Sequence, residues 1–381
     1  GTISDVTLDG GILDIDAATT VTTLTVSADS TITLDANLTT TYATDTGENT
    51  LTLNGSKRYY GDISVPINGK LKASGVNITR TGGVSGGKLT LNGGTVNATT
   101  SIGVFNTVVT DDSTIILDAG ATYHDISKGV NVITLTNELT ISGTGSGTGY
   151  INAPIRVDSG GTLKRTGDAV SFSTSTGTGT IFPVTLNGGT LDIDVATTVT
   201  NLVVSDDSTI DLGGNTLTAT VDTNGKTVTV NGGGTIDAVD LNGGVLDIDA
   251  ATTVTTITTS SNTTIDLGAN TLTATVPTSD KTVTVSGVGG GTITNVTLSG
   301  GTLTVGASTS VTSITTTKNT TIDLGAQLTG TTSTFGHEVT LSGTGAYDGA
   351  ITVNSDGTLK ATGSGTISDV TLDGGILDID A

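Results

Sequence analysis

The chain repeats itself, and this repetition constrains its fold more than any other feature of the sequence. A pattern that reads VTLDGGILDIDA at Val6 returns as VTLNGGTLDIDV at Val184, VDLNGGVLDIDA at Val239 and VTLSGGTLTVGA at Val296. The last three copies begin 55 and 57 residues apart. Internal repetition on this scale is typical of solenoids and arrays, in which each unit contacts only its neighbours.

A second, longer repeat relates the two ends of the sequence. Gly1–Ala17 reads GTISDVTLDGGILDIDA, and residues 365–381 read the same, at an offset of 364 residues. An identity of this length predicts a tandem array with a 364-residue period, of which this sequence holds one period and the start of the next. We expect the two termini to cut through a strand rather than to mark the ends of a natural domain.

Within each copy, short runs alternate aliphatic and polar residues, as in Val6-Thr-Leu8 and Leu13-Asp-Ile15. Period-2 alternation with many β-branched residues predicts short, half-buried strands. Gly-Gly, Asn-Gly and similar pairs separate the runs and are typical of turns, because Gly and Asn accept positive φ. No stretch shows helical periodicity.

Many short strands fit either a row of β-sandwiches or a parallel β-helix. Sandwich domains of the immunoglobulin type need about 100 residues and a bulky core, whereas this chain is 3% aromatic and lacks Trp, Met and Cys. Three strands and three turns form a coil of roughly 20 residues, so each 55–57-residue module would hold about three coils. We predict an all-β parallel β-helix, a β-solenoid, right-handed, with about three short strands per coil.

In such a solenoid, aliphatic residues stack inward from coil to coil, and Thr fills the outward positions. Asn at recurrent turns is expected to form inward ladders that satisfy buried backbone groups. The candidates are Asn92, Asn187 and Asn242, and Asn215 with Asn270.

The regularity of the pattern changes along the chain. We expect one continuous solenoid over 1–381, with regular coils in 1–41 and less regular coils with longer loops in 42–183. Regular modules of roughly 55–74 residues are expected in 184–364, followed by the start of the next repeat in 365–381. Tyrosines and basic residues concentrate in 42–183, which is the predicted contact surface unless they only cover imperfect coils. The candidates for lateral contacts are Tyr59, Tyr60, Tyr123, Tyr150 and Arg165.

The charge of the chain excludes some classes of partner. With 14 basic and 36 acidic residues, the net charge is −22. Nucleic-acid binding requires clusters of Lys and Arg, so we expect no nucleic-acid partner. No apolar run approaches the roughly 20 residues of a membrane-spanning helix, and we expect no membrane insertion.

Paired aspartates are the residues most suggestive of chemistry. They lie at Asp14 and Asp16, Asp192 and Asp194, and Asp247 and Asp249, on the outer face of the LDID strands. Paired carboxylates perform glycoside hydrolysis, but an active site is normally singular, whereas this pair recurs with the repeat. The pattern therefore favours a solvated acidic stripe, with weak Ca²⁺ binding as the alternative. We expect no catalytic residue, no other cofactor and no enzymatic activity.

The segment TTIDLGANTLTATV at 263–276, with its LDID partner, resembles the β-helical repeats of large bacterial secreted proteins. These are filamentous-haemagglutinin-like adhesins, autotransporter passenger domains and giant repeat surface proteins. The resemblance covers most of 184–381 and, more weakly, 1–41, and no catalytic motif is carried over.

The resemblance implies an extracellular or cell-surface location and a non-catalytic role as the repeat unit of a filament or sheath. The alternative is the stalk of a giant adhesin, and a carbohydrate-active β-helix enzyme is less favoured. The implied partners are copies of the same sequence, end to end and side by side, and cell-surface glycans.

Overall fold

A computed structural model describes residues 1–79, 87–126, 131–172 and 183–380. Its described residues form an all-β solenoid of parallel strands with about 19 turns, as the sequence predicts. They contain no helix with the length and hydropathy that a membrane crossing requires. The chain divides into unit 1, Gly1–Val203, and unit 2, Val204–Ala381. The handedness of the coil stays a prediction.

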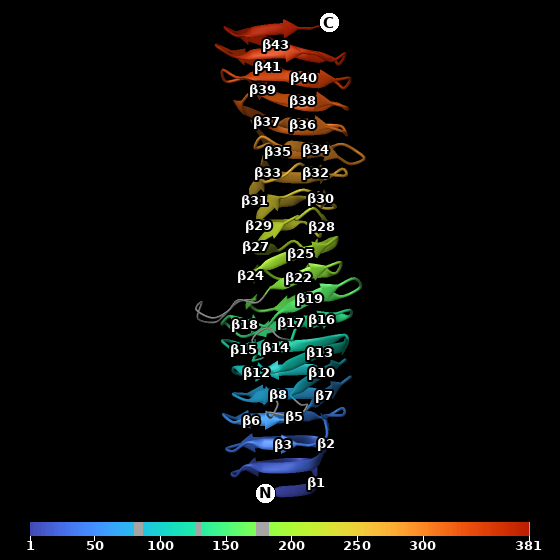
Figure 1. Ribbon diagram of the computed structural model, residues 1–381, viewed down its shortest axis with the longest axis vertical. Coiled ribbons are helices and arrows are strands. Elements are labelled where there is room, and N and C mark those ends of the chain that lie inside the picture. Colours follow the sequence, from blue (N-terminus) through green and yellow to red (C-terminus); the bar gives the residue numbers. More distant parts are fainter. Residues whose placement is uncertain (80–86, 127–130, 173–182, 381) are drawn as a thin grey trace. The chain divides into compact units, whose positions relative to one another are not determined.

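Unit 1 begins with long strands and continues with three short strands in each coil, the number predicted from the sequence (Figure 1). The opening strands are β1 (Thr2–Ile15), β2 (Thr19–Leu34) and β3 (Leu38–Thr40). The first strands of the later coils are β4 (Thr44–Asp45), β7 (Ile63–Pro66), β10 (Lys88–Asn92), β13 (Asn106–Asp111), β16 (Ile133–Leu135), β19 (Ile155–Asp158) and β22 (Val184–Asn187). The second are β5 (Thr50–Gly55), β8 (Lys70–Ser74), β11 (Thr95–Ala98), β14 (Ser113–Asp118), β17 (Glu138–Thr144), β20 (Thr162–Gly167) and β23 (Thr190–Ile193). The third are β6 (Arg58–Tyr60), β9 (Asn77–Thr79), β12 (Ile102–Val104), β15 (Thr122–Asp125), β18 (Gly149–Asn152), β21 (Val170–Phe172) and β24 (Thr197–Val199).

Unit 2 has two strands in each coil, because its longer strand passes a corner without a break. The short strands are β26 (Ser208–Asp211), β28 (Thr227–Asn231), β30 (Val245–Ile248), β32 (Thr263–Asp266), β34 (Thr282–Ser286), β36 (Thr302–Val305), β38 (Thr320–Leu324), β40 (Glu338–Gly343), β42 (Thr358–Ala361) and β44 (Ile376–Ile379). The long strands are β27 (Thr216–Asp222), β29 (Gly234–Leu241), β31 (Thr252–Thr259), β33 (Thr271–Pro277), β35 (Gly291–Ser299), β37 (Thr309–Lys318), β39 (Leu328–Ser333), β41 (Tyr347–Asn354) and β43 (Ile367–Asp373). β25 (Leu202–Asp206) lies where the units divide.

The register of the ladders gives the length of each coil. In unit 2, the register partners Thr229 and Asp247 are 18 residues apart. Coils of unit 1 vary more in length, and its register partners Asp158 and Asn187 are 29 residues apart. Residues 80–86, 127–130 and 173–182 of unit 1 lie outside the described residues.

The core is a set of aliphatic columns that run through the strands of successive coils. One column of unit 2 consists of Val283, Leu303, Ile322 and Leu341, each at most 3% exposed and each paired with the next. Burial of this apolar surface stabilises each coil through its two neighbours. A coil therefore has its full stability only inside a stack.

The predicted inward asparagine ladder is wrong. Asn92 is exposed, and the other four candidates are half-buried beside turns: Asn187, Asn215, Asn242 and Asn270. A turn position leaves each amide at the rim of the coil, where it serves its own turn or a neighbouring one. The interior columns therefore contain no stacked asparagine among these five residues.

Buried threonines at the turns before β28, β34 and β40 satisfy backbone groups instead, and we call Thr223, Thr278 and Thr334 the corner threonines. Thr278 Oγ1 donates to Gly300 O at 2.5 Å and accepts from Ser299 N at 2.9 Å, which ties its turn to that of the next coil. Threonine suits the corner because one hydroxyl both donates and accepts.

Candidate functional site

The acidic pairs lie on the outer faces of their strands, as predicted. In β23, Leu191 and Ile193 are buried and Asp192 is half-buried, and Asp194, directly after the strand, is exposed. Pleating places successive side chains on opposite faces, so both carboxylates leave the same side of the coil.

A lysine on the preceding coil lies between the two carboxylates. Lys164 of β20 is paired in register with Asp192, and its Nζ lies 2.8 Å from Asp192 Oδ2 and 3.2 Å from Asp194 Oδ2. Its hydrogen bonds to Asp192 and Asp194 raise the pKa of Lys164 above its ordinary value. We call this arrangement, one ammonium held by both carboxylates of an LDID pair, a lysine clamp.

The same clamp occurs at the far end of unit 2. Lys360 of β42 is paired in register with Asp378 of β44, and its Nζ lies 3.0 Å from Asp380 Oδ2 and 3.9 Å from Asp378 Oδ2. The hydrogen bond to Asp380 raises the pKa of Lys360. Asp378 and Asp380 are the counterparts, one period on, of Asp14 and Asp16.

Sequence reasoning missed both lysines, although a signal was present. The strands that carry them read GTLKRTG at Gly161 and GTLKATG at Gly357. Each lysine lies one coil before an LDID strand, but finding that partner requires the coil length. That length is 28 residues between Lys164 and Asp192. It is shorter between Lys360 and Asp378.

The third acidic pair has a different environment. Asp247 faces Thr229 on the preceding coil, and Thr229 Oγ1 donates to Asp247 Oδ2 at 3.2 Å. The following coil places Asp266 in register with Asp247. Burial, together with the charges of Asp249 and Asp266, raises the pKa of Asp247. This site gathers like charges rather than neutralising them.

Calcium binding at the acidic pairs stays a prediction. At Asp192 and Asp194 an ammonium already occupies the position between the carboxylates, so a cation would have to displace it. In the described part of the chain, no group of three or more His, Asp or Glu residues has an arrangement that could hold a metal ion.

The structure corrects three of the five predicted lateral contacts. Tyr59, Tyr123 and Arg165 are at most 1% exposed, so their side chains belong to the core of unit 1 rather than to its surface. Tyr60 and Tyr150 are half-buried and remain candidates. The alternative, that residues of this region only cover imperfect coils, does not describe the three buried side chains either, because they lie inside the coils.

The hydroxyls of the buried tyrosines are met by threonine hydroxyls 15 or 16 residues earlier in the chain. Tyr59 Oη lies 2.6 Å from Thr44 Oγ1, and burial raises the pKa of Tyr59 to about 12. Tyr123 makes the same contact with Thr107, at 2.5 Å. Unit 2 also contains such a pair, because Tyr347 Oη lies 2.6 Å from Thr332 Oγ1.

Arg165 occupies an inward position of β20, aligned with Ile141 and Ile193 on the neighbouring coils. Its guanidinium donates to the carbonyl oxygens of Ile141, Thr166 and Asp168 at 2.5, 2.5 and 2.7 Å. Burial lowers the pKa of Arg165 to about 10. The aliphatic part of the Arg165 side chain packs inside the coil, and its guanidinium donates hydrogen bonds to backbone carbonyl groups.

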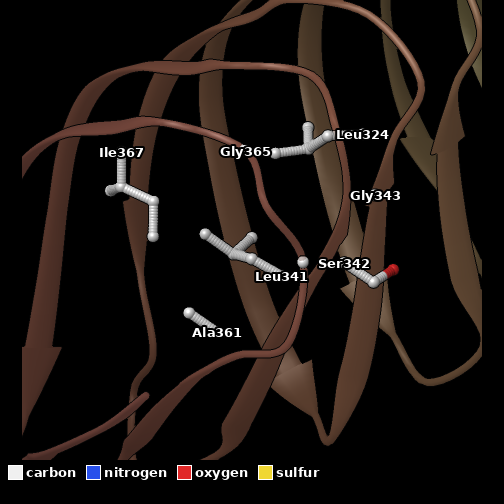
Figure 2. Close-up of a pocket in the computed structure, with 8 residues that line it drawn as sticks. Leu324, Leu341, Ser342, Gly343, Ala361, Gly365 and Ile367 are labelled. Carbon is white, nitrogen blue, oxygen red and sulfur yellow. The ribbon is translucent and has the colours of Figure 1, made fainter. Parts of the chain in front are cut away.

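Two cavities of different size lie in the described part of unit 2. One near the end of unit 2 has a volume of about 10 Å³, space for roughly one water molecule. Figure 2 shows its lining of aliphatic side chains, glycine positions and one serine; Leu324, Leu341 and Ile367 are among them. No titratable side chain lines it.

A larger, open groove of about 280 Å³ lies elsewhere in unit 2. Its lining is rich in hydroxyls and contains one aromatic ring, that of Phe335, which is 58% exposed.

No family model matches the chain, and no curated protein matches it.

Proposed function

We propose that this sequence is the non-catalytic repeat unit of an extracellular or cell-surface filament or sheath, of the kind built by filamentous-haemagglutinin-like and autotransporter-like repeat proteins. The observation that carries the proposal is the uniform stack of unit 2, in which parallel ladders run from β26 to β44 with coils of nearly constant length. The work of such a protein is mechanical. Covalent repetition sets its length.

The chemistry of the stack supports this role. Backbone hydrogen bonds in a parallel ladder point from coil to coil, so a pull along the stack loads many of them together. The outward carboxylates are met by lysines of the same chain in the two clamps, which leaves them less suited to hold a ligand. Hydroxyl-rich outer faces keep the surface soluble, and the charge of −22 repels neighbouring copies at low salt.

The proposal is tested by electron cryo-microscopy of native material from the producing cells. Filaments with an axial spacing of about 4.8 Å are expected, the distance between strands in a sheet. Discrete particles with a single cleft would overturn the proposal.

A second candidate is the stalk of an adhesin that also contacts cell-surface glycans, and the groove at Phe335 favours it. Phe335 has φ +47° at a turn where the equivalent position of another module is Asn224. An exposed ring beside Thr315, Thr331 and Thr352 offers the stacking surface and hydroxyls that neutral saccharides use. Glycan-array binding that is lost in Phe335→Asn would favour the adhesin; equal binding by the variant, or none by either protein, would remove this candidate.

A further inference from the structure

One coil of this protein is present twice, in two different surroundings. Gly1–Ala17 forms β1, which pairs with the following coil through β2. The identical residues 365–381 supply β43 and β44, which pair with the preceding coil through β41 and β42. The two copies together therefore show the same coil with a neighbour on each of its sides.

The two pairings are compatible in register. Inward aliphatic residues of the coil align both with inward residues of the preceding coil and with inward residues of the following coil. The ladder to the following coil shifts by one residue between Leu8 and Asp9, and the alignment continues after the shift. Three of the columns are Val353, Leu372 or Leu8, and Val26; Leu359, Leu377 or Leu13, and Ile32; and Ala361, Ile379 or Ile15, and Leu34.

Burial differs between the copies according to the neighbour that each one has. Leu8 is 7% exposed beneath β2, whereas its counterpart Leu372 is 52% exposed. Ile15 is 4% exposed, whereas Ile379 is 66% exposed. The second copy therefore presents apolar side chains and an open strand edge that a following coil would cover.

The charged residues indicate which coil packs against the open side of the first copy. In the second copy Lys360 is held by Asp378 and Asp380. The same carboxylates of the first copy, Asp14 and Asp16, have no lysine within salt-bridge distance in the described ranges. The first copy thus offers half of a lysine clamp.

Stacking of one intact chain directly on another would not complete that clamp. It would place residues 365–381 against Gly1–Ala17, with Asp378 facing Asp14 and Asp380 facing Asp16. Like charges in opposed positions of neighbouring strands are destabilising. The complementary neighbour is the coil that carries Lys360, with the repeated coil used only once.

We propose that Gly1–Ala17 receives the coil of β41 and β42 from a preceding period joined in tandem, and that Lys360 of that period clamps Asp14 and Asp16. The proposal rests on the proposed repeat function and names its partner surface. The joint between periods is then an ordinary coil of the solenoid rather than a linker.

The test is hydrogen exchange, followed by mass spectrometry, on a chain of residues 1–364 followed by 1–381. Thr7→Ser in the middle copy of the repeated coil gives its peptides a distinct mass. We expect amides of that copy to exchange about tenfold or more slowly than those of either terminal copy, because only the middle copy is paired on both sides. Equal exchange in all three copies would overturn the proposal.

Charge variants of the two-period chain test the clamp itself. Lys360→Glu in the first period is expected to speed exchange of the middle copy, and Asp16→Lys in the second period is expected to restore protection. Lys318→Glu, which breaks one exposed pair with Asp280, is the matched control and should leave the joint unchanged. No effect of Lys360→Glu would refute the clamp. If native material forms filaments but the amides of the middle copy exchange as fast as those of the terminal copies, this inference is refuted and the proposed function is not.

Discussion

Both units are stacks of parallel-stranded coils, but the coils of unit 2 are more regular in length than those of unit 1. Unit 2 keeps its coils nearly constant in length, whereas the coils of unit 1 differ widely in length and retain their parallel ladders throughout (Figure 1). A ladder fixes the positions of strands but leaves the length of the turns free. The described strands of unit 1 therefore keep their pairing although its coils differ in length.

The units also differ in what fills their interiors. The buried side chains of unit 2 are mostly aliphatic. The polar exceptions are Tyr347, one serine and a set of threonines that includes the corner threonines. Unit 1 adds Tyr59, Tyr123 and the guanidinium of Arg165. Larger, hydrogen-bonded side chains suit coils of uneven size, because each reaches backbone or hydroxyl groups that a regular coil would pair by itself.

The largest effect is expected in unit 1 from Arg165→Ala. The substitution leaves a cavity and removes the donors to three carbonyl oxygens, so the free energy of unfolding should fall by about 3–5 kcal/mol. Arg156→Ala, which breaks only a surface pair with Asp158, should cost less than about 1 kcal/mol. Urea denaturation compares them, and similar losses would mean that the buried arginine is no more important than an exposed one.

Tyrosine variants test whether the buried pairs act alike in both units. Burial raises the pKa of Tyr59 and of Tyr347 to about 12, so each neutral phenol contributes stability that is complete below pH 10 and lost as the pH rises toward 12. A shift of this size corresponds to about 2–3 kcal/mol. Tyr59→Phe and Tyr347→Phe should each reduce the alkaline loss by a similar amount in urea denaturation between pH 9 and 12. If either variant loses as much stability at alkaline pH as the parent protein, the buried tyrosines of the two units do not act alike.

Unit 2 should depend on its corner threonines. Thr278→Val keeps the shape of the side chain but leaves Ser299 N and Gly300 O without their hydroxyl partner, at an expected cost of about 1–2 kcal/mol. Thr329→Val, at an exposed outward position, should stay within about 0.5 kcal/mol of the parent. Thermal and urea unfolding measure both losses. If the two variants lose equal stability, the corner hydroxyl has no special role.

The smallest effect is expected from the lysine clamp. Lys164→Met in unit 1 should cost about 0.5–1 kcal/mol at low salt and less at high salt, since the side chains are partly solvated. Because the carboxylates raise the pKa of Lys164, its contribution is complete below the ordinary lysine pKa and is lost as the pH rises above it. Lys226→Met in unit 2, which breaks a single exposed pair with Asp206, should cost less. Equal costs would show that the second carboxylate adds nothing.

Sequence patterns predicted the fold better than they predicted the surface. Alternation in stretches such as Thr282-Val-Thr-Val-Ser286 fixes which side chains point inward, and the 57-residue spacing between Val239 and Val296 corresponds to three coils. The same reasoning placed Tyr59, Tyr123 and Arg165 on the surface, because tyrosines and basic residues concentrate in the less regular region 42–183, whereas all three side chains are buried. Burial of the two phenol groups depends on partners on another strand, such as Thr44 and Thr107, which local sequence pattern does not identify.

What the sequence by itself determined is therefore periodic: strands, turns, an aliphatic interior, a three-coil module and a 364-residue repeat. Only the tertiary structure decided which lysine meets which acidic pair and which threonines are buried. The physical reason is that neighbours along a solenoid are separated by one whole coil. Where that length varies, as it does between Lys164 and Asp192, local pattern cannot supply the register.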